Sequence, residues 1–90
     1  MLLPENTTHF ERDVKKLTKK HRDIEKLKIV IAMIIEEKPL PAKYFNHSLS
    51  GNWKGHQECH IEKDWLLIYQ VVGNVVVFAR TGNHKELFGI

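Results

Sequence analysis

The hydrophobic residues of this 90-residue chain recur first at the spacing of a helix and later at the spacing of a strand. Near the start, Phe10, Val14 and Leu17 lie three or four residues apart, which is the period of one helical face. The stretch Thr8-His9-Phe10-Glu11 has the form of a capping box, in which a hydroxyl and a carboxylate satisfy free backbone amides. These signals predict a first helix over about residues 8–20.

A second helix is predicted to begin near Arg22 or Asp23 and to stop before Pro39, because proline lacks the amide hydrogen that a helix interior needs. Its inward side carries the apolar residues Ile24, Leu27, Ile31, Ile34 and Ile35. Because the connection between the two predicted helices is short, we expect them to form a helical hairpin.

The second half of the chain has the pattern of strands. Trp65 to Val72 and Val75 to Arg80 are rich in aromatic and β-branched residues, and Gly73-Asn74 between them suits a two-residue type II′ turn. Trp53 to Ile61 alternates between two sets of side chains, which predicts a half-buried strand. We therefore expect an antiparallel meander, followed by a turn and one short helical piece over residues 81–88.

Two other segments have weaker signals. Lys38 to Asn52 is rich in Pro, Ser, Asn and Gly, which indicates a surface loop, and this loop carries His47. Met1 to Thr7 is ambiguous, because its two leucines suggest an edge strand whereas Pro4 and Asn6 weaken that prediction.

The length and the cysteine content restrict the class of protein. A chain of 90 residues has room for one hydrophobic core, so residues 1–90 are expected to form a single domain. The lone Cys59 has no partner for an internal disulfide, which fits a reducing, cytoplasmic compartment. The longest apolar run, Ile29 to Ile35, is far shorter than the roughly 18 residues of a bilayer span, and the N-terminus lacks the pattern of an export signal. We expect no membrane association.

Positive charge is concentrated in the first third of the chain. Eight of the fourteen Lys and Arg residues form one basic block, which consists of Arg12, Lys15, Lys16, Lys19, Lys20, Arg22, Lys26 and Lys28. Such a block attracts polyanions through counterion release, so RNA, DNA and an acidic protein are all suitable partners. A solvated helical face without a partner explains the charge pattern equally well.

Several residues of the second half could together cleave RNA. His47, His60, Asp64, Arg80 and His84 include groups that act as acid, base or cation near neutral pH. Attack by the 2′-hydroxyl of RNA needs a base for its proton, an acid for the departing 5′-oxygen and a cation near the phosphate. Each residue alone is more often an ordinary polar group, so the combination carries the hypothesis.

Other kinds of site have less support. His56 and His60 share one face of the predicted strand, but the chain has no Cys-x-x-Cys or His-Glu-x-x-His pattern of a zinc site. Ser48 and Ser50 lie in no strand-turn-helix elbow, and Cys59 is predicted to face the packed side. No glycine-rich phosphate loop is present. We therefore expect neither a metal ion nor another cofactor.

Several ordered blocks closely resemble the YafQ branch of the RelE toxin superfamily. They run from His47 to His60, from Ile61 to Tyr69, from Phe78 to His84 and from Leu87 to Gly89. The resemblance covers residues 38–89 and extends more loosely over the helical hairpin. It implies an α+β fold, with an N-terminal helical hairpin packed on a small antiparallel β-sheet. It also implies a ribosome-dependent endoribonuclease that cleaves mRNA in the A site without metal, contacts ribosomal RNA and is neutralised by a cognate antitoxin of the DinJ or RelB kind.

The resemblance also implies roles for individual residues. It assigns catalysis or substrate contact to His47, His60, Asp64, Arg80, His84 and Phe88. Our hypothesis is that His84 is the general acid, that His47 or Asp64 is the general base, and that His60 and Arg80 hold the scissile phosphate; the acid and base could be exchanged. Phe88 would position a base.

Trp65, Tyr69 and Lys54 are secondary candidates for substrate contact. Trp65 and Tyr69 lie at strand spacing and could simply pack in the core. Lys54 could contact no more than a ribosomal phosphate. Two other functions remain open at this point: a non-catalytic RNA- or DNA-binding module, in which the histidines are plain surface groups, and a zinc-dependent nuclease.

Overall fold

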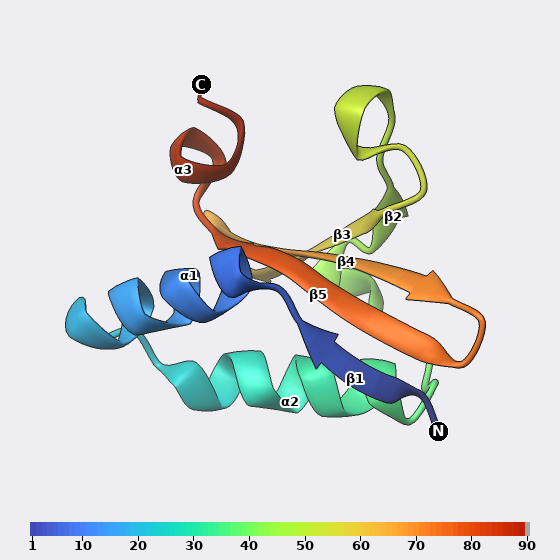
Figure 1. Ribbon diagram of the computed structural model, residues 1–90. Coiled ribbons are helices and arrows are strands. Elements are labelled where there is room, and N and C mark those ends of the chain that lie inside the picture. Colours follow the sequence, from blue (N-terminus) through green and yellow to red (C-terminus); the bar gives the residue numbers. More distant parts are fainter. Residues whose placement is uncertain (90) are drawn as a thin grey trace.

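The computed structural model describes residues 1–89 and has helices packed on a five-stranded sheet (Figure 1). In chain order the elements are β1 (Leu3–Asn6), α1 (Thr8–Lys19), α2 (Ile24–Ile35), the 3-10 helix η1 (Ala42–Tyr44), β2 (His47–Ser48), the 3-10 helix η2 (Gly51–Trp53), β3 (Gln57–Glu62), β4 (Trp65–Val72), β5 (Val75–Gly82) and α3 (His84–Phe88). The strand order in the sheet is β1-β5-β4-β3-β2. The predicted α+β class with an N-terminal helical hairpin is confirmed.

The two long helices begin at side-chain caps. Helix α2 begins after Asp23, whose carboxylate accepts from the amide of Glu25, close to the predicted start. Helix α1 begins one residue earlier than the capping box suggested, because Thr7 and not Thr8 is the N-cap. The Thr7 hydroxyl accepts from the Phe10 amide at 3.0 Å and donates to the Ala79 carbonyl oxygen at 2.7 Å. This second bond ties the start of α1 to β5 and explains the shift.

The sheet is antiparallel from β2 to β5, as the predicted meander requires, and β1 adds to β5 in parallel. The ambiguous first residues therefore form an edge strand, in which Pro4 is tolerated because its missing amide does not interrupt a central ladder. Between β4 and β5, Gly73 takes a φ of +60°, as the first central residue of a type II′ turn does.

Each face of the sheet packs against different elements. Helices α1 and α2 pack on one face, as Figure 1 shows, and the larger core lies beneath them around Trp65, Leu67 and Phe78. A smaller apolar cluster on the other face joins Leu66, Ile68, Ala79 and Leu87, with Leu49, Trp53 and Phe88 packed against it. We call the first the helical face and the second the open face.

The segment before β3 differs from its prediction. The predicted strand from Trp53 to Ile61 begins only at Gln57, because Trp53 ends η2 and Gly55 takes a φ of +88° that an extended strand does not allow. The preceding loop is mostly exposed, as predicted, but contains η1 and the short strand β2. None of the helices in residues 1–89 has the length and apolar character needed to cross a membrane.

Candidate active site

Three histidines meet on the open face of the sheet. Strand β2 places His47 opposite Glu58 of β3, and His60 follows two residues later, which puts it on the same face as Glu58. His84 is the first residue of α3, which leaves the end of β5. The ring centroids of His47 and His60 are 6.3 Å apart, and those of His60 and His84 are 6.0 Å apart. The structure therefore brings together the three histidines that the sequence singled out.

Glu58 lies behind two of these histidines. Its side chain is 5% exposed, and its Oε1 atom is 3.3 Å from Nε2 of His47 and 3.6 Å from Nε2 of His60. On the far side of the His47 ring, Nδ1 is 2.7 Å from the carbonyl oxygen of Phe45, which can only accept, so Nδ1 carries the proton. The imidazole of His47 is thus oriented from both sides. Sequence reasoning gave Glu58 no role.

Asp64 and His84 form a hydrogen-bonded pair. Nδ1 of His84 lies 2.7 Å from Oδ1 of Asp64, and the backbone amide of His84 donates to the same oxygen at 3.2 Å. Asn83 caps α3 in a capping box with Glu86, which fixes the position of His84 at the helix start. Because Asp64 occupies Nδ1, the Nε2 atom of His84 is left for a substrate.

This pair predicts the titration of Asp64. Its pKa is lowered from 3.8, chiefly by the hydrogen bond from the His84 side chain and next by the His84 backbone amide. Because the folded pKa lies below the unfolded one, the interaction stabilises the fold above about pH 3.8, and this contribution is lost as the pH falls through the folded value. We expect an NMR titration of the Asp64 carboxyl carbon to show a midpoint below 3.8.

In the His84→Ala variant the titration midpoint of Asp64 should rise, because the hydrogen bond from the His84 side chain, the larger cause of the lowered pKa, is lost. The Lys85→Ala variant, which changes the exposed neighbour of His84 on α3, is the control and should leave the Asp64 midpoint unchanged. An unchanged Asp64 midpoint in the His84→Ala variant would contradict the pair.

Arg80 is anchored by Asp13 of α1. Its Nε and Nη2 atoms donate to the two carboxylate oxygens of Asp13 at 2.7 and 3.0 Å, and the Thr81 amide donates to the same carboxylate at 3.1 Å. The hydrogen bonds with Asp13 raise the pKa of Arg80. Arg80 stands opposite Ile68, which stands opposite Glu58, so the register puts Arg80 two strands, on the order of 10 Å, from Glu58. Asp13 is a second residue that sequence reasoning missed.

Phe88 lies at the border of the site, whereas Lys54 lies in the segment before β3. The Phe88 ring is 6.3 Å from that of His84 and is partly buried in the cluster of the open face. Lys54 follows η2 and is exposed.

Trp65 and Tyr69, by contrast, belong to the core of the helical face. Trp65 is 1% exposed and donates from Nε1 to the Thr81 hydroxyl at 2.9 Å. The Tyr69 hydroxyl donates to Asn46 at 2.6 Å, and burial raises the pKa of Tyr69 to about 12. The proposed substrate contact of Trp65 is corrected on this ground, because helix packing covers its ring.

Cys59 has the environment of a core residue. It is fully buried on the helical face, as predicted, and burial raises its pKa to about 12, which makes the thiolate unfavourable near neutral pH. Among residues 1–89, no group of three or more His, Cys, Asp or Glu side chains is arranged to hold a metal ion.

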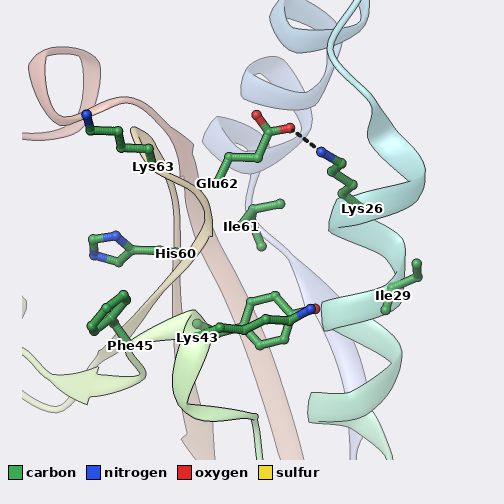
Figure 2. Close-up of a pocket in the computed structure, with 9 residues that line it drawn as sticks. Lys26, Ile29, Lys43, Phe45, His60, Ile61, Glu62 and Lys63 are labelled. Atoms are coloured by element: carbon green, nitrogen blue, oxygen red, sulfur yellow. Dashed lines mark hydrogen bonds and ion pairs between the residues drawn. The ribbon is translucent and has the colours of Figure 1, made fainter.

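A cavity of about 580 Å³ opens beside the histidines, between α2, η1 and the end of β3. It is lined by Lys26, Ile29, Lys43, Tyr44, Phe45, His60, Ile61, Glu62 and Lys63. Figure 2 shows Phe45 and His60 next to each other on one side of β3, and the ion pair between Lys26 and Glu62 on the side of α2. The cavity and the histidine cluster therefore share a wall.

Comparison with known proteins identifies a family with this fold. Residues 3–89 match the family described as the bacterial toxin of type II toxin-antitoxin system, YafQ. The mRNA interferase toxin YafQ of Escherichia coli strain K12 is 43% identical over 86 residues, which are 94% of each chain.

Two solved structures have the same fold. YafQ in the crystal structure of the Escherichia coli DinJ-YafQ complex is 41% identical, has a TM-score of 0.93, and the match covers 99% of this chain and 100% of that one. A metal-bound toxin from Helicobacter pylori is 39% identical with a TM-score of 0.92, over 98% of this chain and 100% of that one. The match in sequence along nearly the whole length and the match in fold lead to one conclusion: this chain belongs to the YafQ family of toxins of bacterial type II toxin-antitoxin systems.

Proposed function

We propose that this protein is an mRNA interferase that cuts mRNA in the ribosomal A site by attack of the RNA 2′-hydroxyl. In this reaction the 2′-oxygen bonds to phosphorus, the bond from phosphorus to the 5′-oxygen breaks, and the products end in a 2′,3′-cyclic phosphate and a 5′-hydroxyl. The observation that carries the proposal is the cluster of His47, His60 and His84, with a carboxylate behind each ring. Such a cluster supplies an acid and a base within reach of one phosphate.

The contacts favour one assignment of roles. His84 is the general acid, because Asp64 holds Nδ1 and leaves Nε2 to donate a proton to the departing 5′-oxygen. His47 is the general base: the Phe45 carbonyl oxygen holds its Nδ1–H, and its Nε2 atom, 3.3 Å from Glu58, takes the proton of the 2′-hydroxyl when the substrate replaces the contact with Glu58. Asp64, the other base considered from the sequence, is a positioning residue in this assignment because it is occupied by His84.

Cationic groups stabilise the charge that develops on the phosphate. His60 lies between His47 and His84 and would contact the phosphate directly. Asp13 takes two of the five N–H donors of Arg80, which leaves three for phosphate oxygens. Phe88 would position a base beside His84.

The basic block supplies a surface for ribosomal RNA. Seven of its eight side chains are exposed, and Arg22 is half-buried. Within residues 1–89 four members of the block form no ion pair, and all four lie on α1: Arg12, Lys15, Lys16 and Lys19. Their charge would draw α1 to phosphates of ribosomal RNA.

The second partner is a cognate antitoxin. The family description names toxin-antitoxin systems, and the Escherichia coli relative was crystallised with DinJ. We propose a DinJ-like partner that neutralises this toxin.

The reaction is proposed to need no metal ion, since the side chains of the cluster supply acid, base and cation. The Helicobacter pylori relative with bound metal makes this point worth testing. Purified protein is added to ribosomes programmed with a defined message, with and without pretreatment of the protein by a chelator, and the new RNA ends are mapped. We expect equal cleavage in both samples and cyclic phosphate ends.

Two results would contradict the proposal. Loss of cleavage after chelation, restored by added metal, would show a metal-dependent nuclease. Full binding to programmed ribosomes without any new RNA ends would show a binding module.

A further inference from the structure

Phe45 is an exposed aromatic side chain beside the proposed site. Phe45 is 66% exposed, so its ring contributes little to the core. Its backbone lies in the left-handed region, with φ 47° and ψ 45°, which is unfavourable for a bulky residue. Neither the family resemblance nor the proposed chemistry gives this ring a task.

The surroundings of Phe45 link it to the histidine cluster. Its ring centroid is 5.6 Å from that of His60, and its carbonyl oxygen accepts from Nδ1 of His47. The rings of Phe45, His60, His84 and Phe88 therefore form a row with neighbouring centroids 5.6, 6.0 and 6.3 Å apart. The two catalytic candidates in the middle have one phenylalanine on each side.

The outer side of Phe45 faces the cavity of Figure 2. Three lysines line this cavity, and they differ in their contacts. Lys26 pairs with Glu62, Lys43 lies 5.1 Å over the Tyr44 ring, and Lys63 is exposed and forms no ion pair within residues 1–89. An aromatic ring next to a cationic cavity is the arrangement that binds single-stranded nucleic acid, in which bases stack and phosphates meet lysine.

We propose that Phe45 forms a second nucleotide subsite, which binds the nucleotide on the opposite side of the scissile phosphate from the one at Phe88. Phe45 stacks on the base, and the cationic cavity beside it attracts the neighbouring phosphate. The subsite rests on the proposed function, because it places the scissile phosphate at the histidines. It would align the RNA across the cluster from both ends.

The experiment uses programmed ribosomes whose message carries a 2′-deoxynucleotide at the cut position, so that it binds but cannot be cut. A 2-aminopurine base, whose fluorescence is quenched by stacking, is placed on either side of that position in two separate messages. Wild-type protein should quench both. Phe45→Ala should lose the quench on one side only, and Phe88→Ala on the other side only.

Affinity gives a second readout. Stacking of one base on an aromatic ring changes the dissociation constant by about 5- to 150-fold. Phe45→Ala is expected to weaken binding of the message by this factor, Phe45→Leu nearly as much, and Phe45→Trp little, because tryptophan keeps the flat ring.

The matched control is Leu3→Ala, which removes an apolar side chain of 59% exposure on β1 and should not change binding. If the wild-type protein cuts unmodified message and the Phe45→Ala variant binds message within twofold of the wild-type affinity, the subsite is overturned and the proposed function is not. A Phe45→Leu variant that binds as well as wild type also overturns the subsite, because an apolar side chain without a flat ring would then be enough for binding. Wild-type protein that neither cuts nor binds message overturns the proposed function as well.

Discussion

The His84→Ala variant is expected to cleave mRNA about 10²- to 10⁴-fold more slowly than the wild-type chain, which is the usual effect of removing a general acid. The effect should lie in the rate at saturating ribosomes, with binding little changed, because the lost interaction belongs to the transition state. The fold should survive, since the His84 side chain is 43% exposed. Single-turnover cleavage on programmed ribosomes measures the rate, and thermal unfolding checks the fold.

Lys85→Ala is the matched control, because Lys85 is the next residue of α3 and is exposed. Asp64→Asn tests the partner, and the double variant with His84→Ala should be no slower than His84→Ala alone, because Asp64 acts through His84. A double variant slowed by the product of the two single effects would give Asp64 an independent role, such as that of the general base.

The Asp13→Ala variant is expected to lose about 3–5 kcal/mol of unfolding free energy, because it leaves a largely buried cation without its partner. The side chains of Asp13 and Arg80 are only 8% and 20% exposed, so solvent screens the pair weakly. The variant also leaves the amide of Thr81 without its acceptor. Because the total unfolding free energy of a small domain is about 5–15 kcal/mol, this variant should be close to unfolding. Urea denaturation measures the loss.

Two variants calibrate this result. Glu25→Ala breaks the Lys28 pair, in which both side chains are mostly exposed, and should cost less than about 1 kcal/mol. Asp13→Asn keeps a carbonyl acceptor but removes the charge, so it should fall between the two. An Asp13→Ala variant as stable as Glu25→Ala would show that the contact with Arg80 carries no net stability. A stable Asp13→Ala variant with slowed cleavage would assign Asp13 to the positioning of Arg80.

Local patterns predicted most of the elements. The helices followed from apolar spacing and from caps such as Asp23, and the hairpin of β4 and β5 followed from Gly73-Asn74, because caps and turns depend on residues next to each other in the chain. The errors were local as well. Trp53 alternates with the strand residues that follow, but the left-handed φ of Gly55 breaks the strand there. Alternation alone does not reveal such a break.

The histidines of the site were also found from the sequence, because their residue type and order match a known pattern. Their partners were not. Glu58 became visible only through the register of β2 and β3, which places it opposite His47 across eleven positions of the chain. Trp65 was open to two interpretations until the helices were seen to cover its face of the sheet.

The sequence by itself therefore determined the helices, the hairpin and the histidines that meet on the open face, since periodicity, turn chemistry and residue type are properties of short stretches. Only the tertiary structure decided which carboxylate stands behind each of these histidines and that Asp13 holds Arg80 from 67 positions away. The physical reason is that strand register and helix packing bring together residues whose separation in the chain carries no signal of contact.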